Sequence, residues 1–312
     1  MSKQLKYDFL LLLVALGWGF SFYLVDITLQ YMGPFMLNSY RFIIAFLVIG
    51  MFSFNKLKNP SRNTLKYSLI IGIVFFIAYG LSNIGIMYTS LSNASFLPGL
   101  SVVFTPILSA LIYKSKPERK LILVVLLSII GTGLLTLTKG FDINSDYFFG
   151  DFVSILTAFF SAMAIVLTGG AVSKEEVDSY QLGVYQLGIV GVLSLIFALA
   201  FEMPKVPAVP HIWLIVLFLA LFCTGFALVI QPVALKYTTD GHVAIILALE
   251  PLFAGFVAYF IAGEVLSNQA YLGAALMISS IFIMEIDFEG LKQRVHQYRL
   301  SKDESQCVGK KE

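Results

Sequence analysis

Residues 179–200 read SYQLGVYQLGIVGVLSLIFALA, a run of 22 residues without one charged side chain. A helix that crosses the roughly 30 Å hydrocarbon core of a bilayer needs about 20 apolar residues, because each residue adds about 1.5 Å. Nine further apolar runs of similar length occur along the chain. We therefore expect ten transmembrane helices, at residues 8–29, 34–54, 67–89, 93–113, 120–138, 150–170, 179–200, 210–234, 241–262 and 268–286.

The overall composition supports a membrane protein. Of the 312 residues, 58% are hydrophobic and only 13% are charged, whereas soluble domains carry about 25% charged residues. So few charges cannot cover a surface that faces water. The connections between the runs are short, and the only long polar segment is a tail at residues 287–312, expected in the cytoplasm. The expected fold class is an all-α integral membrane protein.

The placement of Lys and Arg predicts the orientation in the membrane. If the N-terminus lies inside the cell, 18 of the 21 Lys and Arg residues fall on the inner side, and only Lys139 and Lys205 fall outside. Cytoplasmic loops are enriched in Lys and Arg. Both termini are therefore expected in the cytoplasm, with the protein in the plasma membrane.

The ten runs divide into two halves, residues 8–139 and 150–286. The first run of one half begins inside and that of the other begins outside, so the five-helix halves are expected to be inverted repeats. Phe20-Ser21 and Phe160-Ser161 occupy similar places in the two halves. Inverted repeats are a recurrent plan of secondary transporters. The alternative is a duplication that carries no transport function.

Prolines interrupt corresponding runs of the two halves. Pro98 and Pro106 lie in the fourth run, and Pro251 lies in the ninth. Interrupted helices at matching places point to a binding site and its hinges. The alternative is that neighbouring helices merely satisfy the backbone groups that Pro leaves free.

Ionisable groups inside a membrane are costly and usually functional. Glu250 is the deepest, beside Pro251, and could bind a proton, a cation or a substrate amino group. A Glu that only hydrogen-bonds another helix is the alternative. Arg41 and Asp26 could pair near the outer surface, either as a gate or as an ion pair that fixes the first hairpin. Arg41 could also meet a substrate carboxylate.

In its motifs the chain resembles the EamA-type drug/metabolite transporter superfamily, and the matches cover nearly the whole sequence. They include GWGFSF at 17–22, YRF at 40–42, YTS at 88–90, NASFL at 93–97, GD at 150–151, KYT at 236–238, LEP at 249–251 and GE at 263–264. The first half departs from the pattern, because residues 113–116 read YKSK and lack a Gly-Glu pair. Any role of that acid is therefore carried over to Glu264 alone.

The resemblance implies ten helices, a bacterial origin and a central cavity surrounded by the first four helices of each half. Polar and aromatic residues of those helices are the candidates for its lining. They are Trp18, Asn38, Tyr79, Asn83, Gln186, Gln231 and Glu250. For each of them the alternative is a packing role or a hydrogen bond between helices.

The predicted function is a secondary exporter or exchanger of small uncharged or zwitterionic metabolites, such as amino acids or amphipathic drugs, working by alternating access. A phosphorylated substrate would need several cavity Lys or Arg, and only Arg41 is available. The chain lacks the GxxxxGK[ST] sequence of an ATP-driven motor. Two distant Cys and three scattered His residues predict neither a metal site nor a disulfide, and no cofactor is expected.

Two other functions stay open from the sequence. A lipid flippase or a nucleotide-sugar-type carrier of the same superfamily would share the fold, because a fold does not fix its substrate. An intramembrane enzyme is disfavoured, because the chain has no HExxH and no paired intramembrane aspartates. The expected partners are a small-molecule substrate, membrane lipid and a coupling proton. Nucleic acid is not among them, and both a monomer and a homodimer stay open.

Overall fold

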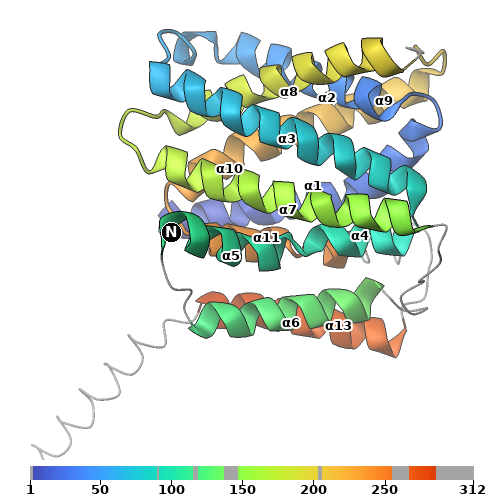
Figure 1. The fold of residues 1–312 in the computed structure, drawn as a ribbon, viewed down its shortest axis with the longest axis vertical. Helices are drawn as coiled ribbons and strands as arrows, with labels where there is room; N and C mark the ends of the chain where they lie inside the picture. Colours follow the sequence, from blue (N-terminus) through green and yellow to red (C-terminus); the bar gives the residue numbers. More distant parts are fainter. Residues whose placement is uncertain are drawn as a thin grey trace, which may run out of the picture.

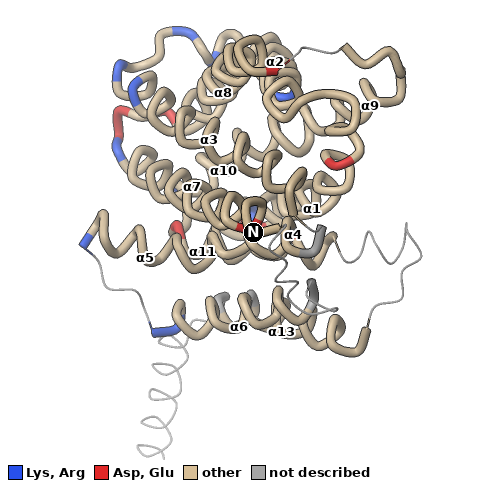
Figure 2. Tube along the Cα trace, turned by 45° about the vertical axis from the view of Figure 1, so that its right-hand side comes forward, with Lys and Arg blue, Asp and Glu red and all other residues tan. Residues whose placement is uncertain are grey.

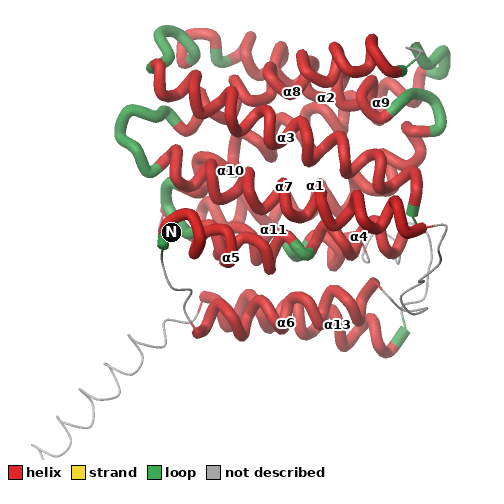
Figure 3. Tube along the Cα trace, in the orientation of Figure 1, coloured by secondary structure: helices red, strands yellow, loops and turns green. Residues whose placement is uncertain are grey.

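The computed structural model describes residues 3–89, 91–114, 119–136, 147–202, 206–254 and 267–285. Within these ranges every regular element is a helix, and the helices run side by side with their loops mainly at the two ends (Figures 1 and 3). The elements are α1 (Lys3–Leu29), α2 (Pro34–Phe52), η1 (Phe54–Lys56), α3 (Arg62–Tyr88), α4 (Leu91–Gly99), α5 (Ser101–Tyr113), α6 (Arg119–Thr136), α7 (Phe148–Val172), α8 (Ser179–Phe201), α9 (Pro210–Phe218), the π-helix η3 (Leu219–Phe226), α10 (Ala227–Leu235), α11 (Asp240–Leu247) and α13 (Asn268–Glu285).

Local chemistry explains several helix starts. Side chains cap four of them: Ser61 accepts a hydrogen bond from the Thr64 N–H, Asp178 from that of Gln181, Thr239 from that of His242 and Ser267 from that of Ala270. Each bond satisfies a backbone donor that has no partner in the first turn. α2 and α9 begin instead with a proline, which suits the first helical position because its missing N–H would be unpaired there anyway.

The expected all-helical fold class is confirmed. Seven helical stretches among the described residues are long and apolar enough to cross a membrane. Nine of the predicted spans fall on these seven, on α6 and on α13, while the span at 241–262 begins on α11 and its residues 255–262 lie outside the described residues. The predicted polar tail at 287–312, together with Lys139, Lys205 and Glu264, lies outside the described residues.

α6 and α13 form a separate layer at one edge of the bundle (Figure 1). They pack mainly on each other. The Ser128 hydroxyl lies 2.9 Å from that of Ser280, and a Cβ added to Gly131 would lie only 2.8 Å from the Gly273 carbonyl oxygen. Small residues thus allow the two backbones to approach closely, as is common between membrane helices.

The described Lys and Arg residues, apart from Arg41, lie at the start of α1 and in the connections α2–α3, α5–α6, α7–α8 and α10–α11. Figure 2 shows most of these positive charges toward one end of the helices. We call this the basic end of the bundle. It is the end at which α1 begins.

Candidate functional site

A cavity opens among α1, α3, α7 and the segments that carry Gln231 and Glu250. Its walls combine aromatic and small polar side chains. They include Trp18, Ser21, Phe22 and Val25 from α1, Phe75, Tyr79, Ser82, Asn83 and Ile86 from α3, and Thr157 and Ser161 from α7. Ligand sites in proteins typically show this mixture of apolar walls with a few polar groups.

Two helix interruptions border the cavity. α4 ends at Gly99, directly after Pro98, and α5 begins at Ser101; all three of these residues line the cavity. α11 ends at Leu247, because the proline at 251 has no N–H to donate to the Leu247 carbonyl. The helix resumes at Glu250. Of the three prolines singled out in the sequence, Pro98 and Pro251 thus coincide with backbone breaks, whereas Pro106 lies inside α5.

The structure brings together five of the seven predicted lining residues: Trp18, Tyr79, Asn83, Gln231 and Glu250 all line the cavity. The other two are fully buried elsewhere. Asn38 accepts a hydrogen bond of 3.0 Å from the Asn83 side chain, which places it behind the wall. Gln186 donates to the Leu228 carbonyl at 2.9 Å.

Pro232 explains the position of Gln186. A proline inside a helix leaves the carbonyl four residues earlier without its usual donor. In α10 that carbonyl belongs to Leu228, and the Gln186 amide supplies the missing hydrogen bond from α8. The sequence contained the signal for this bond, since Pro232 predicts a free carbonyl at Leu228. The Gln186 side chain therefore links α8 to α10 through a hydrogen bond.

Arg41 lines the cavity and is only 2% exposed. Its Nε donates to the Thr224 hydroxyl at 3.1 Å, and its guanidinium lies 5.7 Å from the centre of the Tyr79 ring. The predicted pair with Asp26 does not form in the described structure. The physical reason is the packing, because α1, which carries Asp26, lies against η3, α10 and α11 and makes little contact with α2.

The π-helix η3 anchors α1 and α2 beside the cavity. Trp18 donates its indole N–H to the Cys223 carbonyl at 2.7 Å, and the Cys223 thiol in turn donates to the Gly17 carbonyl at 3.2 Å. Thr224, one residue further, holds Arg41. π-helical turns occur frequently at functional sites. Nothing in the predicted span at 210–234 indicated this one.

Sequence reasoning also passed over two lining hydroxyls. Ser21 and Ser161 both face the cavity, one from α1 and one from α7. The signal was present, because the Phe-Ser pair occurs at 20–21 and again at 160–161. Small polar residues that recur at matching places of two halves could have been predicted as lining.

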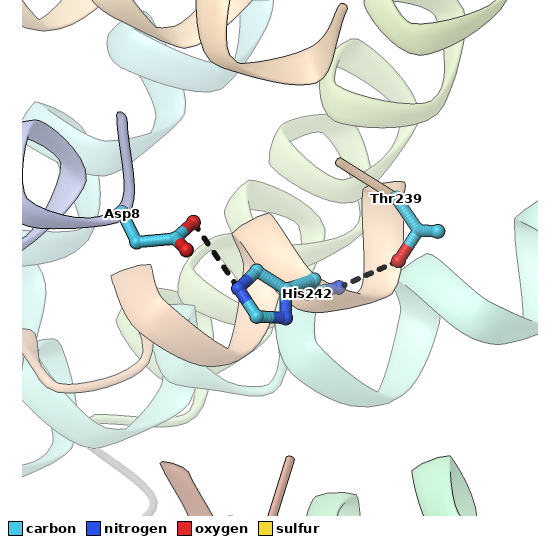
Figure 4. A network of polar contacts seen from close by, with 3 residues as sticks. All are labelled: Asp8, Thr239 and His242. Atoms are coloured by element: carbon cyan, nitrogen blue, oxygen red, sulfur yellow. Dashed lines mark hydrogen bonds and ion pairs between the residues drawn. The ribbon is translucent and has the colours of Figure 1, made fainter. Parts of the chain in front are cut away.

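The basic end of the bundle is closed by contacts beyond the cavity lining. His242 Nε2 lies 3.2 Å from Asp8 Oδ1, and the Thr239 hydroxyl caps α11 at the His242 N–H (Figure 4). Tyr7 and Tyr237 stack with their ring centres 4.9 Å apart. Asp8 precedes Trp18 by ten residues, or roughly 15 Å of helix. On α11 the lining residue nearest to His242 is Leu247, five positions further along the helix.

α5, α7 and α11 also meet at the basic end. The Asp240 carboxylate accepts a hydrogen bond of 3.3 Å from Ser109, and a Cβ added to Gly169 would lie 2.9 Å from the Asp240 Cγ. Tyr113 donates to the Val166 carbonyl at 2.6 Å. On α1 and α3 the cavity lining extends to Val25 and Ile86, toward the opposite end.

Comparison with known proteins identifies the family. The sequence profile of the EamA-like transporter family matches residues 5–137 and again residues 148–286. An uncharacterized transporter from Archaeoglobus fulgidus is 32% identical over 91% of this chain and 87% of its own length. YoaV of Bacillus subtilis, also an uncharacterized transporter, is 21% identical over 89% of this chain and 96% of its length. A crystal structure with 16% identity superposes with a TM-score of 0.76, covering 90% of this chain and 96% of that one, which shows a shared fold. The chain belongs to the EamA-like transporter family.

Proposed function

We propose that this protein is a secondary transporter, an exporter or exchanger, built from ten transmembrane helices in two inverted halves at residues 8–139 and 150–286. The two separate matches of the family profile support the two halves. The gathering of Lys and Arg at the basic end supports a cytoplasmic position for that end and for both termini. The membrane would be the plasma membrane of a prokaryotic cell.

The observation that carries the proposal is a cavity with aromatic and polar walls, bordered by two helix interruptions, with contacts between α1 and α11 at the basic end. Alternating access needs a site that opens to one side at a time and elements that can bend beside it. The proposed hinges are the breaks at Pro98 and Pro251. Pro106 is a third proposed hinge, inside α5, the helix that follows the break at Pro98. Opening of the basic end would expose the same site to the cytoplasm.

The chemistry of the walls suits small uncharged or zwitterionic solutes, such as amino acids or amphipathic drugs. Aromatic rings provide apolar contact, and amides and hydroxyls provide hydrogen bonds. Among the described lining residues Arg41 is the single cation. One cation is too few for a phosphorylated solute, which usually meets several Lys or Arg.

We expect counterflow in proteoliposomes to detect this activity. Vesicles loaded with unlabelled neutral amino acids should accumulate labelled ones transiently, and protein-free vesicles should not. If Glu250 carries a coupling proton, Glu250→Gln keeps exchange but loses accumulation driven by a pH gradient. Absence of counterflow across a panel of amino acids, drugs and sugars would overturn the proposal.

Two buried glutamines provide a matched test of the cavity. Gln231 lines it, whereas Gln186 bonds the Leu228 carbonyl away from it. We expect Gln231→Leu to lower counterflow about tenfold, as the loss of one or two good hydrogen bonds to a solute would. Gln186→Leu should lower the free energy of unfolding by about 1 kcal/mol and leave counterflow per folded molecule nearly unchanged. Equal rates for the two variants would show that solutes do not use the Gln231 wall.

A further inference from the structure

Most N–H donors of the Arg41 guanidinium have no partner among the described residues. Its guanidinium carries five N–H donors, and only Nε has a hydrogen-bond partner among the described residues. No described carboxylate lies within ion-pair distance of it. The side chain is nevertheless only 2% exposed, and what exposure it has is to the cavity, which it lines. A buried charge without a partner is costly.

Glu250 places a carboxyl group in the same cavity. It lines the wall from the segment after the α11 break, and no ion pair joins it to Arg41. The two groups therefore stand apart within one site. Gln231 lies in the same lining, and its buried Oε1 has no hydrogen-bond partner among the described residues. The site thus contains donors for an anion and acceptors for a cation that are not paired with each other.

We propose that Arg41 binds the carboxylate of the transported solute, while Glu250 and Gln231 receive its ammonium group. The proposal deepens the proposed transport function and rests on the same cavity. A guanidinium fork matches a carboxylate with two parallel hydrogen bonds. Thr224 and the Tyr79 ring hold the fork in place. One cation and one acid together select a solute with no net charge and both groups ionised.

The aromatic wall defines the rest of the solute. Trp18, Phe22, Phe75 and Tyr79 line the cavity together, and apolar rings favour an apolar side chain over a polar one. The solute class is therefore a zwitterionic amino acid with an apolar side chain. A phosphate ester would bring a second negative charge, for which the described lining has no further cation.

Binding to the purified full chain tests the proposal without requiring transport. The chain has two tryptophans, Trp18 in the cavity wall and Trp213 outside it, so in a Trp213→Phe background the indole fluorescence reports on the cavity. The probes are two matched sets: phenylalanine, phenethylamine and 3-phenylpropanoate, and leucine, isopentylamine and 4-methylpentanoate. Within each set the amine lacks the carboxylate and the acid lacks the ammonium group.

We expect the wild-type chain to bind each zwitterion at least about tenfold more tightly than its amine or its acid, because hydrogen bonds to charged groups are strong. Arg41→Gln should remove the preference over the amine and leave amine binding unchanged. Glu250→Gln should remove the preference over the acid. Arg41→Lys keeps the charge without the fork, and should keep only part of the preference if Arg41→Gln does not fold. Gln186→Leu is the control and should keep the wild-type preferences.

Several results would overturn the proposal. They are equal binding of zwitterion and amine by the wild type, an unchanged preference in both folded Arg41 variants, and no binding of any probe. The outcome for the proposed function is separate. Binding that depends on Arg41 in the absence of counterflow would refute the transport function and support the zwitterion site. Counterflow of uncharged solutes that does not change in Arg41→Gln would support the transport function and refute the zwitterion site.

Discussion

A disulfide formed through Gly169→Cys and Asp240→Cys is expected to reduce counterflow to the level of protein-free vesicles, and a reducing agent should restore it. A Cβ at position 169 would lie 2.9 Å from the Asp240 Cγ, which is about where the sulfur of a Cys at 240 would lie, so the two side chains are close enough for a disulfide. The bond would hold α7 to α11 at the basic end. If that end must open in each cycle, the cycle stops. The background carries Cys223→Ala and Cys307→Ala, which remove both native thiols.

The edge layer provides a control. The hydroxyl oxygens of Ser128 and Ser280 lie 2.9 Å apart, so Ser128→Cys with Ser280→Cys should also cross-link. That bond joins α6 to α13, which pack mainly on each other, and counterflow should survive it. Each single variant should also transport. Complete cross-linking of α7 to α11 with an unchanged rate would mean that the basic end stays closed during transport.

Gly19→Ala is expected to lower both stability and transport, whereas Gly17→Ala, two residues away on α1, should change little. A Cβ on Gly19 would lie 2.8 Å from the Ala254 backbone nitrogen and 2.9 Å from the Glu250 carbonyl oxygen. Backbone atoms cannot move aside as a side chain can, so α1 would have to separate from the segment that carries Glu250. Overpacking of this kind typically costs about 1–3 kcal/mol. The thermal midpoint should fall by several degrees, at about 2–4 °C per kcal/mol for a chain of this order of size.

Gly17 is the matched control because a Cβ there would meet only the Cys223 thiol, at an ordinary 3.8 Å. Thermal unfolding in detergent and counterflow per folded molecule measure the two effects separately. A thermal midpoint of Gly19→Ala equal to that of Gly17→Ala would show that the close approach of α1 to Glu250 is not needed.

Much of the helical fold follows from the lengths of the apolar runs, because a bilayer leaves a chain few alternatives to spanning helices. The Pro-Gly at 98–99 also predicted the break between α4 and α5. The π-helix at 219–226 could not be predicted in this way. Its sequence LALFCTGF has no proline, and the distortion is set by what packs on it, namely the indole of Trp18 and the guanidinium of Arg41.

For the candidate site, residue type and position within a predicted span identified the buried polar groups, but they did not predict which way each side chain points. Gln186 and Gln231 look alike in sequence, and the difference between them depends on which helix lies opposite each one. Arg41 was expected beside Asp26 because the first two helices are joined by a short turn. The bundle instead places α2 along α8 and turns Arg41 inward. The direction of these side chains depends on packing between segments that are far apart in the sequence, and a single sequence does not show which segments are in contact.

The α6–α13 pair has a consequence for biosynthesis. α6 is complete at Thr136, but its main partner begins at Asn268. Ribosomes add about 5–20 residues per second, so on the order of ten seconds pass before α13 can reach it. During that time the Gly131 face of α6 has only lipid or a passing helix as its neighbour. Chains released before residue 268 would keep this face uncovered, and completion of the fold thus waits for the last described helix.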